Sequence, residues 1–293
     1  MSTASLPLAP KTGFWHNRAV KRFRSNLLAK IGLFMVVALT LACFVGPYLL
    51  PYDELFIDVR NRFAPPLTGG HIFGTDPLGR DIAARLFHAG QISLMVGFMA
   101  MIISTVIGTV VGVVAGYRGG WIGAVLMRLV DAFLAFPAIF LLLVLAAFIK
   151  PSPLMITFII AITSWMEVAR IVEAEVKTVR ERDYVMAARS LGLSSSWIMF
   201  REILPNVIAP IVVAATLTVA RSILMEAYVS FLGYGIQAPT PSWGNMLNGA
   251  QQYLIQAPWM AIVPGLAITI AVTGFNFIGD GLRDALDVRS QKK

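Results

Sequence analysis

The sequence predicts an all-α polytopic membrane protein with six transmembrane helices. Hydrophobic residues make up 57% of the 293 residues and only 14% are charged, which is too little charge to cover a soluble domain of this size. Six apolar runs each reach the length of about 20 residues that a helix needs to cross the hydrocarbon core. The net charge of +8 agrees with the excess of Lys and Arg that cytoplasmic loops carry.

The predicted spans follow one another along most of the chain. They lie at 28–50, 92–116, 122–149, 153–175, 206–230 and 258–279. The third run is longer than a bilayer requires at a rise of about 1.5 Å per residue, so its first turns are expected to project from the membrane.

The remaining segments define the predicted organisation. They are a basic N-terminal arm at 1–27, an outer loop at 51–91, a core domain at 92–282 with a cytoplasmic hairpin at 177–204, and a tail at 283–293. The arm holds Lys and Arg without any acidic residue, whereas 232–257 holds no charged residue. Both termini are therefore predicted to be cytoplasmic, which an even number of spans also requires.

Motifs for catalysis or metal binding are absent from the sequence. It contains no GxxxxGK[ST] phosphate loop, no HExxH and no GxSxG. The histidines are far apart, and a single cysteine, Cys43, excludes an intrachain disulfide. The chain is predicted not to be an enzyme and to bind no metal or cofactor.

Ionisable residues within apolar spans are candidates for a gate or a transport pathway. Glu167 and Arg170, spaced i, i+3 in the fourth span, form either a structural pair or part of an inner gate. Arg128 and Asp131 share that spacing and are expected to pair at the membrane interface. The candidates for gate or pathway are Glu167, Arg170, Glu226 and Trp243.

Glu226 and Trp243 lie toward the outer side of the membrane. Arg221 and Glu226 are near the outer end of the fifth span, where their side chains can extend to water. Trp243 follows the turn-forming segment APTPS, so it either closes an outer gate or caps the structure. In the outer loop, Asp76 and Asp81 are expected to pair locally with Arg80 and Arg85 rather than to bind a cation.

Small residues recur every fourth position in the second span, at Ser104, Gly108, Gly112 and Gly116. Such a stripe lets another helix approach closely. The sequence leaves open whether that helix belongs to this chain or to a second membrane subunit.

The segment YVMAARSLGLSSSWIMFREILPN at 184–206 predicts two short helices in water. Tyr184, Ala188 and Leu191 share one face of the first helix, and Gly192 permits a left-handed turn at its end. Ser194 is a candidate N-cap for the second helix, which places Trp197, Phe200 and Leu204 in a stripe. Pro205 is tolerated where that helix continues into the fifth span. By periodicity alone, the hairpin either docks on a partner or rests on lipid headgroups with Trp197 as an anchor.

The same segment resembles the EAA signature loop of ABC-importer permeases, in which EAA, three residues, Gly and nine residues precede I-x-L-P. Ala187, Ala188, Gly192, Leu204 and Pro205 occupy matching positions, while Met186 replaces the usual Glu and Glu202 the usual Ile. Four further segments resemble the C-type permease subunit of dipeptide and oligopeptide importers. They are HIFGTDPLGRDIAARL (71–86), VDAFLAFPAIFLL (130–142), ILMEAYVSFLGYGIQAPTPSWGNML (223–247) and NFIGDGLRDALDVR (276–289).

The resemblance implies a type I ABC importer permease fold in a bacterial inner membrane. The implied partners are a homologous second permease, two ATP-binding subunits that carry ATP and Mg, an extracytoplasmic peptide-binding protein and the lipid bilayer, with no nucleic acid. The implied ATPase-coupling residues are Tyr184, Ala187, Ala188, Arg189, Gly192, Ser194, Trp197 and Pro205.

Substrates within the family include dipeptides, oligopeptides, glutathione and nickel chelates. An alternative from another class is a self-sufficient secondary transporter. That alternative would call for inverted repeats or acidic residues at the bilayer midplane, which the sequence does not clearly show.

Overall fold

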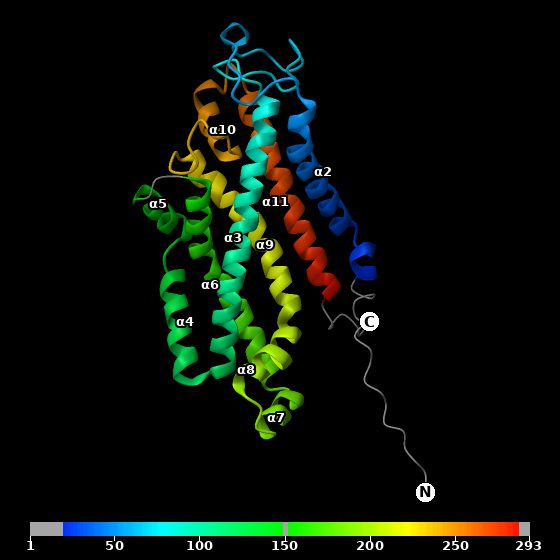
Figure 1. Ribbon diagram of the computed structural model, residues 1–293, viewed down its shortest axis with the longest axis vertical. Helices are drawn as coiled ribbons and strands as arrows, with labels where there is room; N and C mark the ends of the chain where they lie inside the picture. Colours follow the sequence, from blue (N-terminus) through cyan, green and yellow to red (C-terminus); the bar gives the residue numbers. More distant parts are fainter. Residues whose placement is uncertain (1–19, 149–151, 287–293) are drawn as a thin grey trace.

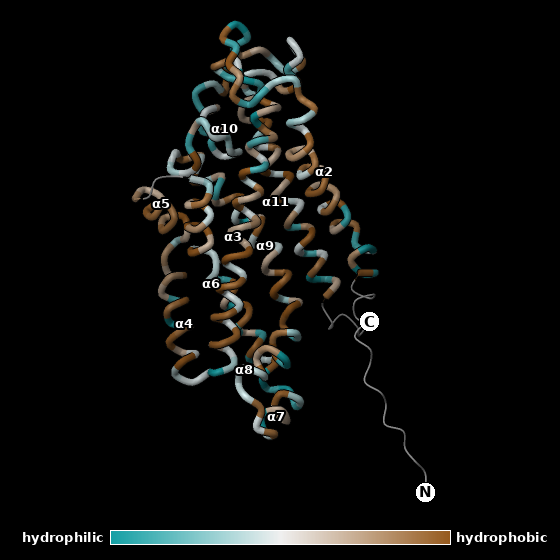
Figure 2. The backbone as a smooth tube through the Cα atoms, viewed as in Figure 1, coloured by the Kyte–Doolittle hydropathy of each residue, from teal (hydrophilic) through white to brown (hydrophobic). Residues whose placement is uncertain are grey.

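The computed structural model describes residues 20–148 and 152–286, and within these ranges the chain is helical and has no β-strand. Most of the predicted basic arm and the end of the tail, including Lys11, Arg18 and Arg289, lie outside the described residues. The long helices run side by side along the longest axis (Figure 1). Hydrophobic colour dominates them, and hydrophilic segments gather toward the two ends (Figure 2). The architecture is that of a multi-pass membrane protein.

Within residues 20–148 and 152–286, five helices are long and apolar enough to cross a bilayer. They are α2 (Leu27–Leu49), α3 (Ile82–Arg118), α6 (Pro153–Arg180), α9 (Leu204–Phe231, preceded without a break by Ser195–Ile203) and α11 (Trp259–Leu286). Helix α3 starts well before the predicted residue 92, because the Asp81 carboxylate accepts a hydrogen bond from the Ala84 N–H at 2.7 Å and caps the helix there.

The third predicted span is broken rather than continuous. Helices α4 (Gly120–Leu134) and α5 (Ala138–Phe148) meet at a bend of 80°. Pro137 explains the break, because proline has no N–H to donate and disfavours a helical conformation of the residue before it. The prediction of one long helix over 122–149 was therefore wrong. The span count is five, or six if the bent pair counts as one span.

The glycine stripe of α3 packs against α6 of the same chain. A Cβ atom at Gly108 would lie 2.6 Å from the Trp165 carbonyl oxygen, and one at Gly112 would lie 2.7 Å from that of Ala169. A Cβ at Gly116 would lie 2.8 Å from the Val176 Cβ. Of the two alternatives for this stripe, the structure shows close packing within the subunit.

The remaining helices complete the bundle around this contact. Helix α9 packs against α3, α6 and α11, and α11 also packs against α2. At one end, the segment from 50 to 81 forms a loop above the bundle, beside the short helix α10 (Trp243–Ala250) (Figure 1).

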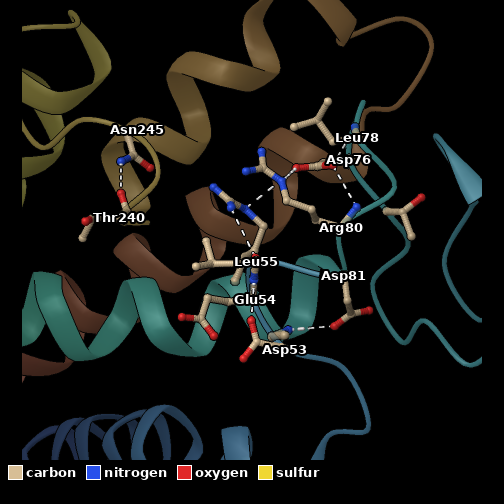
Figure 3. Close-up of polar contacts among 12 residues, drawn as sticks. Asp53, Glu54, Leu55, Asp76, Leu78, Arg80, Asp81, Thr240 and Asn245 are labelled. Carbon is tan, nitrogen blue, oxygen red and sulfur yellow. Dashed lines mark hydrogen bonds and ion pairs between the residues drawn. The ribbon is translucent and has the colours of Figure 1, made fainter. Parts of the chain in front are cut away.

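Charged groups of that loop are paired locally. Asp76 accepts hydrogen bonds from the N–H groups of Leu78 and Arg80, and its Oδ2 lies 2.7 Å from Arg80 Nε (Figure 3). This confirms the predicted local pairing of Asp76. Asp81 pairs with His71 at 2.9 Å instead of with an arginine.

Candidate functional site

The predicted hairpin forms the end of the bundle opposite the 50–81 loop (Figure 1). Helix α7 (Asp183–Ser190) is capped by Leu191 and followed by Gly192, whose φ of +77° is the left-handed conformation predicted for it. Ser194 Oγ accepts a hydrogen bond from the Trp197 N–H at 3.3 Å, which confirms the predicted N-cap of α8 (Ser195–Ile198). A π-helical turn, Met199–Ile203, joins α8 to α9, so Pro205 falls in the first turn of a transmembrane helix.

Apolar packing fixes the hairpin to three long helices. Val185, Ala188, Ile198 and Ile203 are buried in one cluster with residues of α3 and α6, including Tyr117 and Val176. The hairpin therefore shares one packed cluster with the neighbouring ends of α3 and α6. The hairpin is also covalently continuous with α9.

Two arginines add polar contacts to this attachment. The Arg189 guanidinium lies over the Tyr117 ring, 5.5 Å from its centroid. The Arg180 guanidinium donates to the Gly116 carbonyl oxygen at 3.1 Å. Both contacts reach the last turns of α3.

The opposite face of the hairpin exposes several large apolar side chains among charged and polar ones. Leu191 is 80% exposed and Phe200 is 71% exposed, with Tyr184 and Trp197 near 40%. Of the predicted coupling residues, those on the surface are Tyr184, Ala187, Arg189, Gly192, Ser194, Trp197 and Pro205. Ala188 is 7% exposed, so the predicted shared face of Tyr184, Ala188 and Leu191 needs correction: Ala188 packs inward, and Ala187 is the exposed alanine.

Two interhelical ion pairs lie on one face of α4, α6 and α9. Arg170 of α6 pairs with Asp131 of α4, and Glu167 of α6 pairs with Arg221 of α9. The expected i, i+3 pairs are thus not formed, because Glu167 and Arg170 each reach a different neighbouring helix. Asp131 likewise forms its ion pair with Arg170 rather than with Arg128.

These four side chains are between 41% and 61% exposed in the isolated chain. Charged groups within membrane-spanning helices face a water-filled cavity or another protein surface rather than lipid. The α4–α6–α9 face therefore has the character of a surface that lines a pathway or meets a partner. The sequence analysis did not include Asp131 and Arg221 among the gate or pathway candidates. Their charges, opposite to those of Arg170 and Glu167 and placed in other spans, could have indicated the two pairs.

Glu226 and Trp243 are fully buried and do not line this face. The Glu226 carboxylate accepts hydrogen bonds from Ser93 Oγ at 2.9 Å and Ser230 Oγ at 2.7 Å. The Trp243 N–H donates to Ser93 Oγ at 3.3 Å, and its Nε1–H donates to the Leu86 carbonyl oxygen at 3.1 Å. The expectation that Glu226 extends to water was wrong, because α10 folds over it and closes a network between α3, α9 and α10.

Comparison with known proteins places the chain in a family. Residues 108–292 match the family described as binding-protein-dependent transport system inner membrane component. Residues 13–66 match the N-terminal transmembrane domain of oligopeptide transport permease C.

Curated relatives match over most of their length. The dipeptide transport system permease protein DppC of Alkalihalophilus pseudofirmus is 41% identical over 269 residues, covering 92% of this chain and 88% of the relative. The oligopeptide transport system permease protein OppC of Escherichia coli is 40% identical over 275 residues, covering 93% of this chain and 91% of the relative. The corresponding OppC of Bacillus subtilis is 38% identical over 274 residues, covering 94% of this chain and 90% of the relative.

A solved structure supports the fold. A chain of the inward-facing MetNI methionine ABC transporter aligns with a TM-score of 0.57 at 20% identity, covering 69% of this chain and 97% of that one. Together with the family matches and the helical architecture, this leads to one conclusion: the chain belongs to the binding-protein-dependent transport system inner membrane components, with the N-terminal domain typical of oligopeptide permease C.

Proposed function

We propose that the chain is the permease subunit of an ATP-driven importer of dipeptides or oligopeptides, coupled to separate ATP-binding subunits through the 184–206 hairpin. The observation that carries the coupling role is the hairpin itself. Its inner side packs against α3 and α6, and its outer side exposes large apolar side chains such as Leu191 and Phe200. The peptide substrate is supported by the names of the DppC and OppC relatives.

The proposed assembly contains a second, homologous permease, two ATP-binding subunits and an extracytoplasmic peptide-binding protein. ATP and Mg are held by the ATP-binding subunits, since this sequence has no phosphate loop. Both termini and the hairpin face the cytoplasm, and the α4–α5 pair counts as the sixth span. The five basic residues of the 177–204 segment support this orientation, as does the absence of charge from 232–257 at the other end.

Transport follows from how the hairpin is attached. Closure of the ATP-binding subunits displaces the hairpin, and α6 and α9 move with it. These two helices carry Glu167, Arg170 and Arg221, so the interhelical ion pairs break and re-form as the pathway alternates between its two openings. The second permease covers the α4–α6–α9 face and encloses the pathway with it.

Substitution of the exposed alanine tests the coupling role. Ala187→Arg places a long charged side chain on the docking face without entering the buried cluster. We expect peptide uptake by the reconstituted transporter to fall by about tenfold or more, as for the loss of about 1.4 kcal/mol or more at an interface. Membrane insertion and melting temperature should stay at wild-type values.

Two variants serve as comparisons for Ala187→Arg. Ala187→Ser keeps a small side chain and should retain uptake. Gly192→Asp forces a non-glycine residue to adopt a φ of +77° and should also uncouple the hairpin. If the Ala187→Arg transporter took up peptide and hydrolysed ATP in response to peptide at wild-type rates, the coupling role would be contradicted. Gradient-driven uptake by this chain alone would also contradict the proposal. The substrate class is tested by measuring how strongly glutathione, nickel chelates and a panel of peptides each inhibit the uptake of a labelled peptide.

A further inference from the structure

A cavity of about 250 Å³ lies at the end of the bundle opposite the hairpin. Three parts of the chain wall it: the loop and first turn of α3 at 76–85, the segment 230–249 that includes most of α10, and Met260 of α11. Ile82, Ser230 and Ile236 are buried in the wall, whereas Gly233, Gln237 and Asn248 are exposed. The cavity is therefore closed below and bordered by exposed residues above.

Arg85 is a buried cation in the wall of this cavity. Its side chain is 8% exposed, yet among the described residues it makes a single hydrogen bond, a long one of 3.5 Å to the Glu54 carbonyl oxygen. Its Nε lies 3.9 Å from Asp76 Oδ2, beyond hydrogen-bonding distance. A guanidinium has five N–H donors, and the Arg85 nitrogens without a partner are not enclosed by protein, so their N–H groups are open to the cavity. An arginine placed only to hold the loop would be expected to make closer contacts.

The acidic groups near Arg85 are already engaged elsewhere. Asp76 accepts from two backbone N–H groups and from Arg80 Nε at 2.7 Å (Figure 3). The Glu54 carboxylate lies 3.2 Å from His88 Nε2. The charged residues that line the cavity are Asp76, Arg80 and Arg85, so its wall carries one more positive than negative charge.

The exposed rim of the cavity supplies hydrogen-bond acceptors. The Gln237 amide donates through Nε2 to the Gly233 carbonyl oxygen at 2.7 Å, and Asn248 Nδ2 donates to that of Phe231 at 2.7 Å. In the part of the chain that the structure describes, the side-chain oxygens of Gln237 and Asn248 have no partner. The cavity thus combines unused N–H donors on a cation with unused amide oxygens.

We propose that this cavity receives the free carboxylate of a short zwitterionic peptide, with Arg85 as the carboxylate-binding residue. The amide oxygens of Gln237 and Asn248 accept from the ligand's ammonium group. The volume is just below the range of about 300 Å³ and upward seen for drug-sized ligands, so it fits one or two amino-acid residues, and a longer chain extends past the exposed rim. The identity of the ligand as a peptide rests on the proposed function.

Protection of an introduced cysteine tests the cavity without requiring transport. Ala238 is exposed and lines the cavity, and Ala238→Cys adds only a thiol. The native Cys43 is buried, so it should label slowly. The Ala238→Cys chain is assembled with its partner subunits in nanodiscs without the binding protein, and maleimide labelling of this chain is followed over time.

We expect millimolar dialanine to slow labelling about threefold at twice its Kd, by simple mass action. Dialanine amide, which lacks the carboxylate, should leave the rate unchanged. Arg85→Gln should abolish the protection, and Arg85→Lys should retain part of it. Gln237→Leu, at the exposed rim, should weaken protection by dialanine more than protection by N-acetyl-dialanine.

Four results would overturn the proposal, and the first three concern dialanine and Arg85. They are equal labelling with and without dialanine, equal protection by the acid and the amide, and full protection in an Arg85→Gln chain that retains the wild-type melting temperature. Protection by acetate as strong as that by dialanine would indicate a simple anion site and would also overturn it. Peptide uptake is measured separately, so uptake without protection refutes the cavity alone, and protection without uptake refutes the proposed transport function alone.

Discussion

The two ends of the bundle use charge in opposite ways. At the hairpin end, the charged residues of α7 and its flanks are largely exposed, and apolar packing of Val185, Ala188 and Ile198 attaches the hairpin. At the opposite end, Asp76, Asp81 and Glu226 are buried and accept hydrogen bonds within polar networks.

This difference separates two tasks. Apolar packing is not directional, so the hairpin can move as one piece with the helices beneath it while its surface stays open to a partner. Hydrogen bonds are directional, so the opposite end is held in one defined geometry around its cavity. Substitutions at the polar end are therefore expected to lower stability, and those at the hairpin end to lower coupling.

The largest effect is expected from Glu226→Ala at the polar end. It leaves the hydroxyl groups of Ser93 and Ser230 without their carboxylate acceptor, and each buried unsatisfied polar group costs about 1–3 kcal/mol. For these two groups the unfolding free energy should fall by about 2–6 kcal/mol, seen as a lower melting temperature of the purified complex. Glu226→Gln retains an acceptor and should lose much less. Equal melting temperatures for Glu226→Ala and wild type would mean that this network does not hold the outer end together.

An intermediate effect is expected midway between the ends, at the pair of Glu167 and Arg221. Arg221→Glu places two acids side by side, and the reversed pair Glu167→Arg with Arg221→Glu restores opposite charges. Because the pair is more than half exposed, its coupling energy should be at most about 1 kcal/mol, or about fivefold in uptake. A double-mutant cycle on peptide uptake measures it. Strictly additive losses would show that the two residues act independently in transport.

Local features could be predicted from the sequence because they depend on neighbours within a few positions. The left-handed Gly192 and the Ser194 cap follow from rules that involve one helical turn. The apolar runs likewise identify most of the spanning helices. Pro137 was a readable signal for the α4–α5 bend, but the unbroken apolar run around it favoured a single span.

The charged contacts could not be predicted because they depend on how helices are rotated and at what depth they meet. Glu167 and Arg170 satisfy the i, i+3 rule, yet both pair with other helices. Glu226 lies near a helix end, where the sequence favours contact with water, and only the return of α10 over α9 buries it. Ala188 is a further example. Helical periodicity grouped it with Tyr184 and Leu191 but could not say which side of the hairpin packs against the bundle.

The smallest effect is expected at the hairpin end, from Arg189→Gln. This change removes the stacking of the guanidinium on Tyr117, which is worth about 0.5–1 kcal/mol at an exposed site, so the melting temperature should barely change. Because the contact ties the hairpin to α3, we expect more ATP to be hydrolysed per peptide imported, by about twofold. Arg201→Gln is the matched control, since Arg201 is an exposed arginine of the same hairpin without a side-chain contact in the described residues. An equal loss in both variants would assign the effect to positive charge at the docking surface, and a loss in Arg189→Gln alone would assign it to the attachment of the hairpin to α3.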